Sequence, residues 1–325
     1  EPASSFSSAV TANYAFDANL SGLTLGKSGN LTNVTLNSLV NIAGPITVYA
    51  PQITVNQALS SGAGLSLNGQ SVLNGSTITT TGAQNYMGAV TLSKDTTLTT
   101  GGTAGVNFAN TVNGGYSLSV ISAGATVFNG AVGGTTALTS LTTDAGGTVA
   151  INGGIVNTTG AQSYGEAASL GANAVLSSTA AGDISFANTL NGAKTLAINT
   201  TGATVFNGAV GGTAALASLT TDAGGTVAIN GAGIKTTSAQ TYFDAVNLGH
   251  DVVLTGVNVS LLSTVDGAYA LTLEDTGTTV LGDVIGGNTP LMRLTTDSSD
   301  SHDGVTQLKG ARILQRLAWE SWRRS

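Results

Sequence analysis

Hydrophobic and polar residues alternate in short runs along most of the chain. Runs such as VTL, LSV, ATVF and TVAI are rich in β-branched and aliphatic residues, and Gly, Asn or Asp separate them. Alternation with a period of two, bounded by turn residues, is typical of short β-strands with one buried side. The pattern therefore predicts an all-β chain of many short strands.

The strand pattern also repeats over a long interval. The segments TTGAQNY, TTGAQSY and TTSAQTY contain Gln84, Gln162 and Gln240, which follow one another at equal intervals. The segments GATVFNGAVGG and LTTDAGGTVAING recur with the same offset, and a further copy, GTTVLGDVIGG, follows after a slightly shorter one. A repeat of this length fits either a string of immunoglobulin-like sandwiches or a solenoid with several coils in each repeat.

The interior of the repeat favours the solenoid. Tyr86, Phe108, Phe128 and Ile151 are each expected to begin a short strand, and they follow one another at nearly regular intervals. A shorter interval then leads to Tyr164 of the next copy. These spacings predict four coils of about 20 residues in each repeat, with like side chains stacked above like. A sandwich has no reason to repeat internally at a quarter of its length.

We therefore predict an all-β fold, a parallel β-helix (β-solenoid) of about 13–15 coils with a short C-terminal amphipathic helix. Residues 1–20 are a lead-in that pairs with the first coil or with another molecule. Residues 21–78 are degenerate coils, residues 79–297 hold the 78-residue repeats, and residues 298–325 are a linker and the helix. Asn-Gly pairs signal hairpins in antiparallel sheets, but they serve equally well at coil corners, and their regular recurrence favours corners.

Composition changes in the last part of the chain. Both tryptophans and five of the ten basic residues lie within residues 304–325. At 100° per residue, apolar side chains gather on one side of a helix beside a basic stripe. Three interpretations of this helix stay open: a cap on the solenoid end, a helix on a membrane surface, or a docking element for a partner or a neighbouring subunit. The candidate residues are Leu308, Arg312, Leu314, Arg316, Trp319 and Trp322.

Charge and cysteine content exclude several classes of partner. Only 8% of residues are charged, the net charge is −7, and residues 1–292 contain four Lys and no Arg. Such a surface has no footprint for a phosphate backbone, so we expect no nucleic acid partner. The absence of Cys excludes disulfides and thiolate metal sites.

The acidic residues predict no catalytic pair. Asp144, Asp222 and Asp297 are equivalent in the repeat, and four rungs would separate successive members by about 19 Å. Paired carboxylates in glycoside hydrolysis lie about 5–10 Å apart, so we expect corner residues that bond their own backbone. Glu274 and Asp275 are adjacent and should point to opposite sides of a strand.

Other chemical signatures are weak. His250 and His302 are the only histidines and lie far apart in the sequence, which disfavours a zinc site. The acidic loop around Asp300 lacks the spacing of an EF-hand, and no G-x-S-x-G motif occurs. We therefore predict no catalytic residue, no metal site and no cofactor, and expect a protein that is not an enzyme.

The segments in residues 22–69, together with the TTGAQ-Y-AV-L and FNGAVGG units, resemble filamentous haemagglutinin-like proteins, the large adhesins that bacteria secrete or display. The resemblance covers roughly residues 20–297 and lies in the style of the repeats. It implies a right-handed parallel β-helix that a Gram-negative cell exports through an outer-membrane transporter. It also implies an adhesin or matrix component whose partners are host or bacterial surfaces. The pattern ends at Asp297, where SSDSHDG replaces AGGTVAING.

The leading function hypothesis is an extracellular structural or adhesive solenoid that binds through extended polar faces. The first alternative is a subunit of an extracellular filament that assembles end to end. The Thr96–Thr100 segment, TTLTT, also resembles one rung of an ice-binding face. A polysaccharide-active β-helix enzyme is the fourth hypothesis, and it requires a cluster of acids and bases in one cleft.

Overall fold

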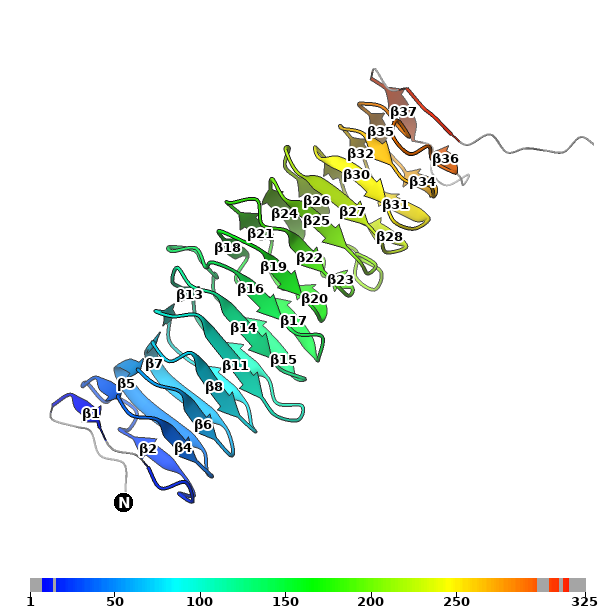
Figure 1. Cartoon of the computed structure of the whole chain (residues 1–325). Helices are drawn as coiled ribbons and strands as arrows, with labels where there is room; N and C mark the ends of the chain where they lie inside the picture. The colour runs from blue at the N-terminus through cyan, green and yellow to red at the C-terminus, as the bar shows by residue number, and fades with distance from the viewer. Residues whose placement is uncertain (1–7, 14–15, 297–303, 310–311, 316–325) are drawn as a thin grey trace, which may run out of the picture.

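A computed structural model describes residues 8–13, 16–296, 304–309 and 312–315. These residues form an elongated parallel β-solenoid of about 14 turns, whose rungs follow one another along a single axis from the N-terminal to the C-terminal end (Figure 1). The structure confirms the predicted all-β solenoid and its number of coils. The alternative of separate immunoglobulin-like sandwiches is wrong, because neighbouring strands pair in parallel from one turn to the next.

The strands belong to four sheets, which together cover three sides of the solenoid. The 13-stranded sheet contains β1 (Val10–Ala12), β2 (Leu23–Leu25), β3 (Val34–Leu36), β5 (Ile46–Val55), β7 (Leu65–Leu73), β9 (Gln84–Tyr86), β10 (Val90–Leu92), β12 (Val106–Phe108), β13 (Val112–Asn113), β15 (Ala125–Phe128), β17 (Thr148–Ile151), β20 (Ala167–Leu170) and β23 (Leu190–Asn191). The 12-stranded sheet contains β4 (Val40–Ile42), β6 (Leu59–Ser61), β8 (Thr77–Thr80), β11 (Thr96–Thr100), β14 (Leu118–Ile121), β16 (Leu141–Thr143), β19 (Gln162–Tyr164), β22 (Ile184–Phe186), β25 (Ala203–Phe206), β27 (Thr226–Ile229), β30 (Ala245–Leu248) and β33 (Val265–Asp266). The eight-stranded sheet contains β18 (Ile155–Thr158), β21 (Ala174–Ser178), β24 (Thr195–Thr200), β26 (Ser218–Thr221), β29 (Gln240–Tyr242), β32 (Val259–Leu261), β35 (Thr278–Leu281) and β37 (Val305–Leu308). The four-stranded sheet contains β28 (Gly233–Lys235), β31 (Val252–Gly256), β34 (Ala270–Asp275) and β36 (Arg293–Thr296).

Each turn of the chain passes through three sides in a fixed order, which we call face 1, face 2 and face 3. Face 1 begins at β2 and passes through the first halves of β5 and β7 to β23; Val210 then connects it to the four-stranded sheet. Face 2 begins at β1 and passes through the second halves of β5 and β7 to β13; Val132 then connects it to the eight-stranded sheet. Face 3 is the 12-stranded sheet.

The core consists of stacked side chains that alternate with outward-facing ones along each strand. Most of the buried side chains are Val, Ile and Leu, and the largest fully buried ones include Tyr86, Tyr164 and Tyr242. On face 1 the rings of Tyr86, Phe108 and Phe128 stack with centroids 5.1 Å apart in both contacts. Each of these three residues ends its strand, so the expectation that it begins one is wrong.

The second copy of the repeat builds its aromatic stack on a different side of the solenoid. The rings of Tyr164, Phe186 and Phe206 stack on face 3, with centroids 4.9 and 5.7 Å apart. Tyr242, which begins the third copy, lies on face 2 and pairs with Leu261. Equivalent residues of successive repeats therefore do not lie directly above one another.

The number of turns in each repeat explains why equivalent residues lie on different sides. From Tyr86 the column on face 1 rises through Phe108, Phe128 and Ile151 to Leu170, which lies four turns above it. The next copy begins before that point, at Tyr164 on the preceding side. Each repeat is thus one side short of four turns, and makes about three and two-thirds turns. The prediction of four coils in each repeat is wrong, because the short interval from Ile151 to Tyr164 spans two sides of a turn and not a coil.

A buried Gln and Tyr pair recurs in each copy and holds the start of each repeat in place. Nε2 of Gln162 donates to the carbonyl oxygens of Val156 and Ser177 at 3.2 and 2.9 Å, and the Tyr164 hydroxyl donates to Oε1 of Gln162 at 3.0 Å. The pairs Gln84–Tyr86 and Gln240–Tyr242 make the same bonds. Burial raises the pKa of all three tyrosines, so their hydroxyls remain protonated donors.

Asparagine ladders close the corners between sides. Nδ2 of Asn129 donates to Oδ1 of Asn107 at 3.0 Å, and Nδ2 of Asn152 donates to Oδ1 of Asn129 at 2.8 Å. The corresponding pair of the next copy is Asn207 and Asn230, at 2.8 Å. The Asn-Gly pairs therefore lie at coil corners, as predicted, and not in antiparallel hairpins.

The C-terminal part of the described chain is a strand. Residues Val305–Leu308 form β37, and Leu308 pairs with Leu281 on the rung below. Ile313 and Gln315 form further parallel bridges to Ile285 and Leu291. The predicted amphipathic helix is therefore wrong for residues 305–308, because pairing with the open edge of β35 satisfies backbone groups that would otherwise stay unpaired. The described residues contain no helix.

Candidate functional site

The outer surface of the solenoid carries columns of polar side chains, one residue in each rung. On face 3 one column runs through the following outward-facing residues on six consecutive rungs: Thr77, Thr97, Ser119, Thr142, Ser163 and Ser185. On face 1 a second column runs through Thr24, Thr47, Ser66, Asn85 and Asn107. Adjacent rungs lie about 4.8 Å apart, so these hydroxyl and amide groups form regular polar arrays.

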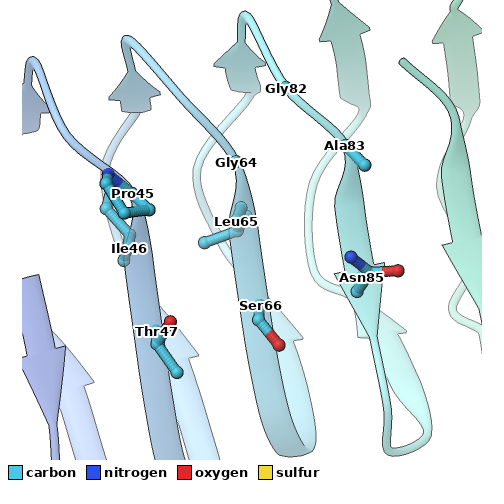
Figure 2. Close-up of a pocket in the computed structure, with 9 residues that line it drawn as sticks. All are labelled: Pro45, Ile46, Thr47, Gly64, Leu65, Ser66, Gly82, Ala83 and Asn85. Carbon is cyan, nitrogen blue, oxygen red and sulfur yellow. The ribbon is translucent and has the colours of Figure 1, made fainter. Parts of the chain in front are cut away.

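The grooves on this surface are open and small. One of about 300 Å³ crosses β5, β7 and β9, where Thr47, Ser66 and Asn85 stand side by side (Figure 2). Gly64 and Gly82 also line this groove. The hydroxyl and amide groups can form hydrogen bonds with a polar ligand, but the three side chains contain no titratable group for acid–base chemistry.

Two acidic residues come together at the corner between β16 and β17. Asp144 follows β16, and Glu166 occupies the corresponding corner one rung higher, after β19. Oδ1 of Asp144 accepts a hydrogen bond from the amide of Ser122 on the rung below, at 3.0 Å. We call Thr143, Asp144 and Glu166 the first acid corner.

Glu166 is the unusual member of this corner. Its side chain is 0% exposed, and neither carboxylate oxygen has a hydrogen-bond partner among the described residues. Burial raises the pKa of Glu166, and the negative charge of Asp144 raises it further. The Thr143 hydroxyl is itself buried without a hydrogen-bond partner in the described chain. The corner therefore gathers buried oxygen atoms that have no hydrogen-bond partner among the described residues.

The next copy of the repeat builds a second acid corner from Thr221, Asp222 and Asp244. Asp244 is 2% exposed, and its Oδ1 accepts a hydrogen bond from the amide of Gly225 at 2.8 Å. Its Oδ2 and the Thr221 hydroxyl have no partner within the described ranges. Burial raises the pKa of Asp244, and the charge of Asp222 also raises it.

Buried side-chain oxygens without a partner occur, among the described residues, only around these two corners. Besides the atoms already named, they are the hydroxyls of Thr126 and Thr204. Thr126 lies on β15, next to the same corner one rung below, and Thr204 is its equivalent in the next copy of the repeat. Buried oxygens without a hydrogen-bond partner thus appear twice in the described chain, at equivalent places in the repeat.

Asp275 shows how the solenoid satisfies a buried carboxylate elsewhere. Its oxygens accept hydrogen bonds from the amides of Asn258, Val259 and Gly277 and from the Thr279 hydroxyl, at 2.7 to 2.9 Å. Burial alone would raise the pKa of Asp275, but these four bonds outweigh it and lower the pKa. Glu274 lies on the outer side and accepts a bond from Thr255, which confirms that the two acids point to opposite sides.

Asp144 and Asp222 were predicted to lie in one column four rungs apart, but they lie at different corners of the solenoid. Their partners Glu166 and Asp244 were not predicted. The missing signal was the interval of one coil, which separates Asp144 from Glu166 and Asp222 from Asp244. No group of three or more His, Cys, Asp or Glu that could hold a metal occurs in the described ranges.

The candidate interaction residues at the C-terminal end are only partly described. Leu308 is 56% exposed, Arg312 is exposed and Leu314 is half-buried. Arg316, Trp319 and Trp322 lie outside the described residues, as do His302, Asp297 and Asp300. His250 is exposed, and its ring stacks on Tyr269 with centroids 6.5 Å apart. Within the described chain, no helix is long and apolar enough to cross a membrane.

Comparisons with known protein families, with curated proteins and with solved structures find no match to this chain.

Proposed function

We propose that this chain is an extracellular structural or adhesive β-solenoid, exported by a Gram-negative bacterium, which binds matrix or cell-surface components along its sides. The resemblance of its repeats to those of filamentous haemagglutinin-like proteins supports this proposal and the right-handed coil that goes with it. The proposal includes an outer-membrane transporter as the export partner. It includes no catalytic activity.

The observation that carries the proposal is the run of outward-facing hydroxyl and amide side chains on consecutive rungs. About 14 turns at about 4.8 Å each give a rod about 65 Å long. Along it, the column from Thr77 to Ser185 presents one hydroxyl on every rung. A polymer that lies along such a face can form many weak bonds at once, and multivalent attachment of this kind is strong without a deep pocket.

The scarcity of basic residues fits an exposed location. Residues 1–292 contain only Lys27, Lys94, Lys194 and Lys235 as sites for trypsin-like proteases. Hydrogen bonds between rungs hold the backbone, and small-residue corners leave few long loops for other proteases to reach. A chain of this kind suits a setting in which proteases are abundant.

The proposal is tested by binding of the purified chain to immobilised bacterial exopolysaccharide and host matrix preparations. The variant Ser119→Lys/Thr142→Lys/Ser163→Lys places three like charges on face 3, and Thr220→Lys/Thr241→Lys/Ser260→Lys does so on face 2. We expect one triple variant to lose binding while its circular dichroism stays unchanged. Failure of the unaltered chain to bind any of these preparations, or full binding by both variants, would contradict the proposal.

Self-assembly into a filament is the second candidate, and the last described rung favours it. Val305 and Leu308 on β37 are 59% and 56% exposed, and β37 pairs only with β35 in the described chain. An end of this kind can add a strand from another copy. Electron microscopy at high protein concentration tests this candidate, since single rods about 65 Å long would exclude it.

The structure limits the support for ice binding. Thr77 and Thr79 on β8 and Thr97 and Thr99 on β11 face outward in register, which makes a Thr-x-Thr array of two rungs. On the next rung Ile121 takes the place of the second Thr. Ordering water needs a larger flat array than these two rungs. We therefore propose adhesion and not ice binding.

A further inference from the structure

We propose that each acid corner binds one divalent cation with a preference for hard oxygen ligands, and that Ca²⁺ is the cation that fits. The site goes beyond the adhesive function and does not depend on it. The first site is formed by Thr143, Asp144 and Glu166. The second is formed by Thr221, Asp222 and Asp244.

Glu166 and Asp244 are buried, and neither carboxyl group has a positively charged neighbour in the described chain. A buried carboxylate without a donor or a counter-ion is strongly unfavourable. Both carboxylates lie against a second acid, and no Lys, Arg or His of the described chain acts on either of them. Each corner therefore holds two acidic groups, and one divalent cation balances their charge.

The available atoms at each corner are oxygens. Glu166 offers both carboxylate oxygens, Thr143 offers its hydroxyl, and Asp144 offers an oxygen beside the one that the Ser122 amide occupies. A cation can satisfy several acceptors at once, whereas every further hydrogen bond needs a donor. Ca²⁺ accepts six to eight oxygens in irregular geometry and completes its shell with water, while Mg²⁺ demands a regular octahedron.

The repetition of the corner is independent support. The two copies differ at nearby positions, since Gly165 corresponds to Phe243 and Ala168 to Val246. Both nevertheless keep a threonine, an aspartate one residue later and a buried acid one rung above. The buried Asp275 of the third copy is the contrasting case, because four donors satisfy its carboxylate and leave nothing for a cation.

The two sites differ in strength for a structural reason. Both oxygens of Glu166 are without a partner in the described chain, but Oδ1 of Asp244 is occupied by the amide of Gly225. The first site thus offers one more oxygen and should bind Ca²⁺ more tightly. With two carboxylates each, both sites belong to the weak extracellular class, with dissociation constants of about 10⁻⁴ to 10⁻³ M.

Equilibrium dialysis of the full chain with Ca²⁺, after treatment with a chelator, tests the proposal. We expect two Ca²⁺ per chain at about 10 mM, above the weakest dissociation constants of this class, and a melting temperature that rises with Ca²⁺ until it saturates. Glu166→Gln should remove the tighter site and Asp244→Asn the weaker one. Glu274→Gln, which removes a half-buried acid on the outside of β34, is the matched control and should keep both.

A milder variant covers the case in which an acid substitution prevents folding. Thr143→Val keeps the shape of the side chain and both acids, and should weaken the first site about tenfold or more without changing the second. The proposal is overturned if the unaltered chain binds no Ca²⁺ at about 10 mM. It is equally overturned if Glu166→Gln/Asp244→Asn still binds two ions, or if Thr143→Val and the control bind alike.

Discussion

The aromatic stack on face 3 gives a quantitative test of how the core is built. Phe186 is fully buried between Tyr164 and Phe206, with ring centroids 4.9 and 5.7 Å away. Replacing a buried Phe by Ala removes apolar contacts and leaves a cavity, which costs about 3–5 kcal/mol. A solenoid cannot collapse around the gap easily, because the rungs above and below fix the backbone.

The position of a ring within the stack sets a second expectation. Phe186 loses two aromatic contacts when it is removed, whereas Phe206 loses only one, since its other neighbour in the column is Ile229. Each aromatic contact adds about 0.5–1.5 kcal/mol beyond area burial. We therefore expect Phe186→Ala to cost about 1 kcal/mol more than Phe206→Ala.

Equilibrium unfolding in urea, followed by circular dichroism, measures these costs. Because neighbouring rungs of a solenoid can open separately, hydrogen exchange of amides in β19, β22 and β25 shows whether the loss is local. The outward-facing Ser185→Ala is the control and should stay within about 0.5 kcal/mol of the unaltered chain. A cost below about 1 kcal/mol for Phe186→Ala, or a larger cost for Phe206→Ala, would refute the stacking argument.

Three further predictions concern buried and corner polar groups. The folded state lowers the pKa of Asp275, so the stability that Asp275 contributes is present above the ordinary carboxyl pKa of about 3.9 and is lost as pH falls through the lowered value. In thermal melts from neutral to acidic pH, the melting temperature should therefore fall less steeply for Asp275→Asn than for the unaltered chain. Equal slopes would contradict this prediction. Gln162→Leu leaves two carbonyl oxygens and the Tyr164 hydroxyl without their partner, and it should lower the free energy of unfolding in urea by about 3 kcal/mol or more. An unchanged free energy of unfolding would show that the Gln162–Tyr164 pair does not hold the repeat in place. Asn129→Ala breaks a ladder that is exposed to solvent and should cost only about 1 kcal/mol by the same measurement, so a loss as large as that of Gln162→Leu would be unexpected.

The sequence predicted the solenoid because its signals are local. Short alternating runs, turn residues and the nearly regular intervals between them all describe one rung and its neighbours. Asn129 and Asn152 are one coil apart in the sequence and bond directly in the structure. The opposite orientation of Glu274 and Asp275 followed from the period of a strand.

The rotation of the repeat was not predicted, because a sequence repeat does not state how far the chain turns. Ile151 and Tyr164 occupy the same kind of position in their strands, at the last residue of each. Only the pairing of Ile151 with Leu170, and of Tyr164 with Thr143, shows that they lie on different faces. The acid corners have a different explanation, because coils of about 20 residues already place Glu166 about one coil above Asp144; the pairs were missed because only equivalent acids of successive repeats were compared.

The predicted C-terminal helix is wrong for residues 305–308 because periodicity alone ignored the open edge of the sheet. The segment around Leu308 shows apolar residues at helical spacing, yet β35 offers it unpaired backbone groups. Pairing in register with Leu281 wins over local helical preference, as tertiary context often does.

Disulfide trapping tests the rotated solenoid most directly, and the absence of native Cys makes the result unambiguous. Ala150 and Ser169 are outward-facing partners on adjacent rungs, about 4.8 Å apart, which is within the reach of a disulfide. We predict that Ala150→Cys/Ser169→Cys forms an intramolecular disulfide on mild oxidation, detected by mass spectrometry, and that Ala150→Cys/Ser163→Cys does not. Cross-linking of the second pair instead of the first would mean that Tyr164 lies above Ile151 and that the repeat makes four whole turns.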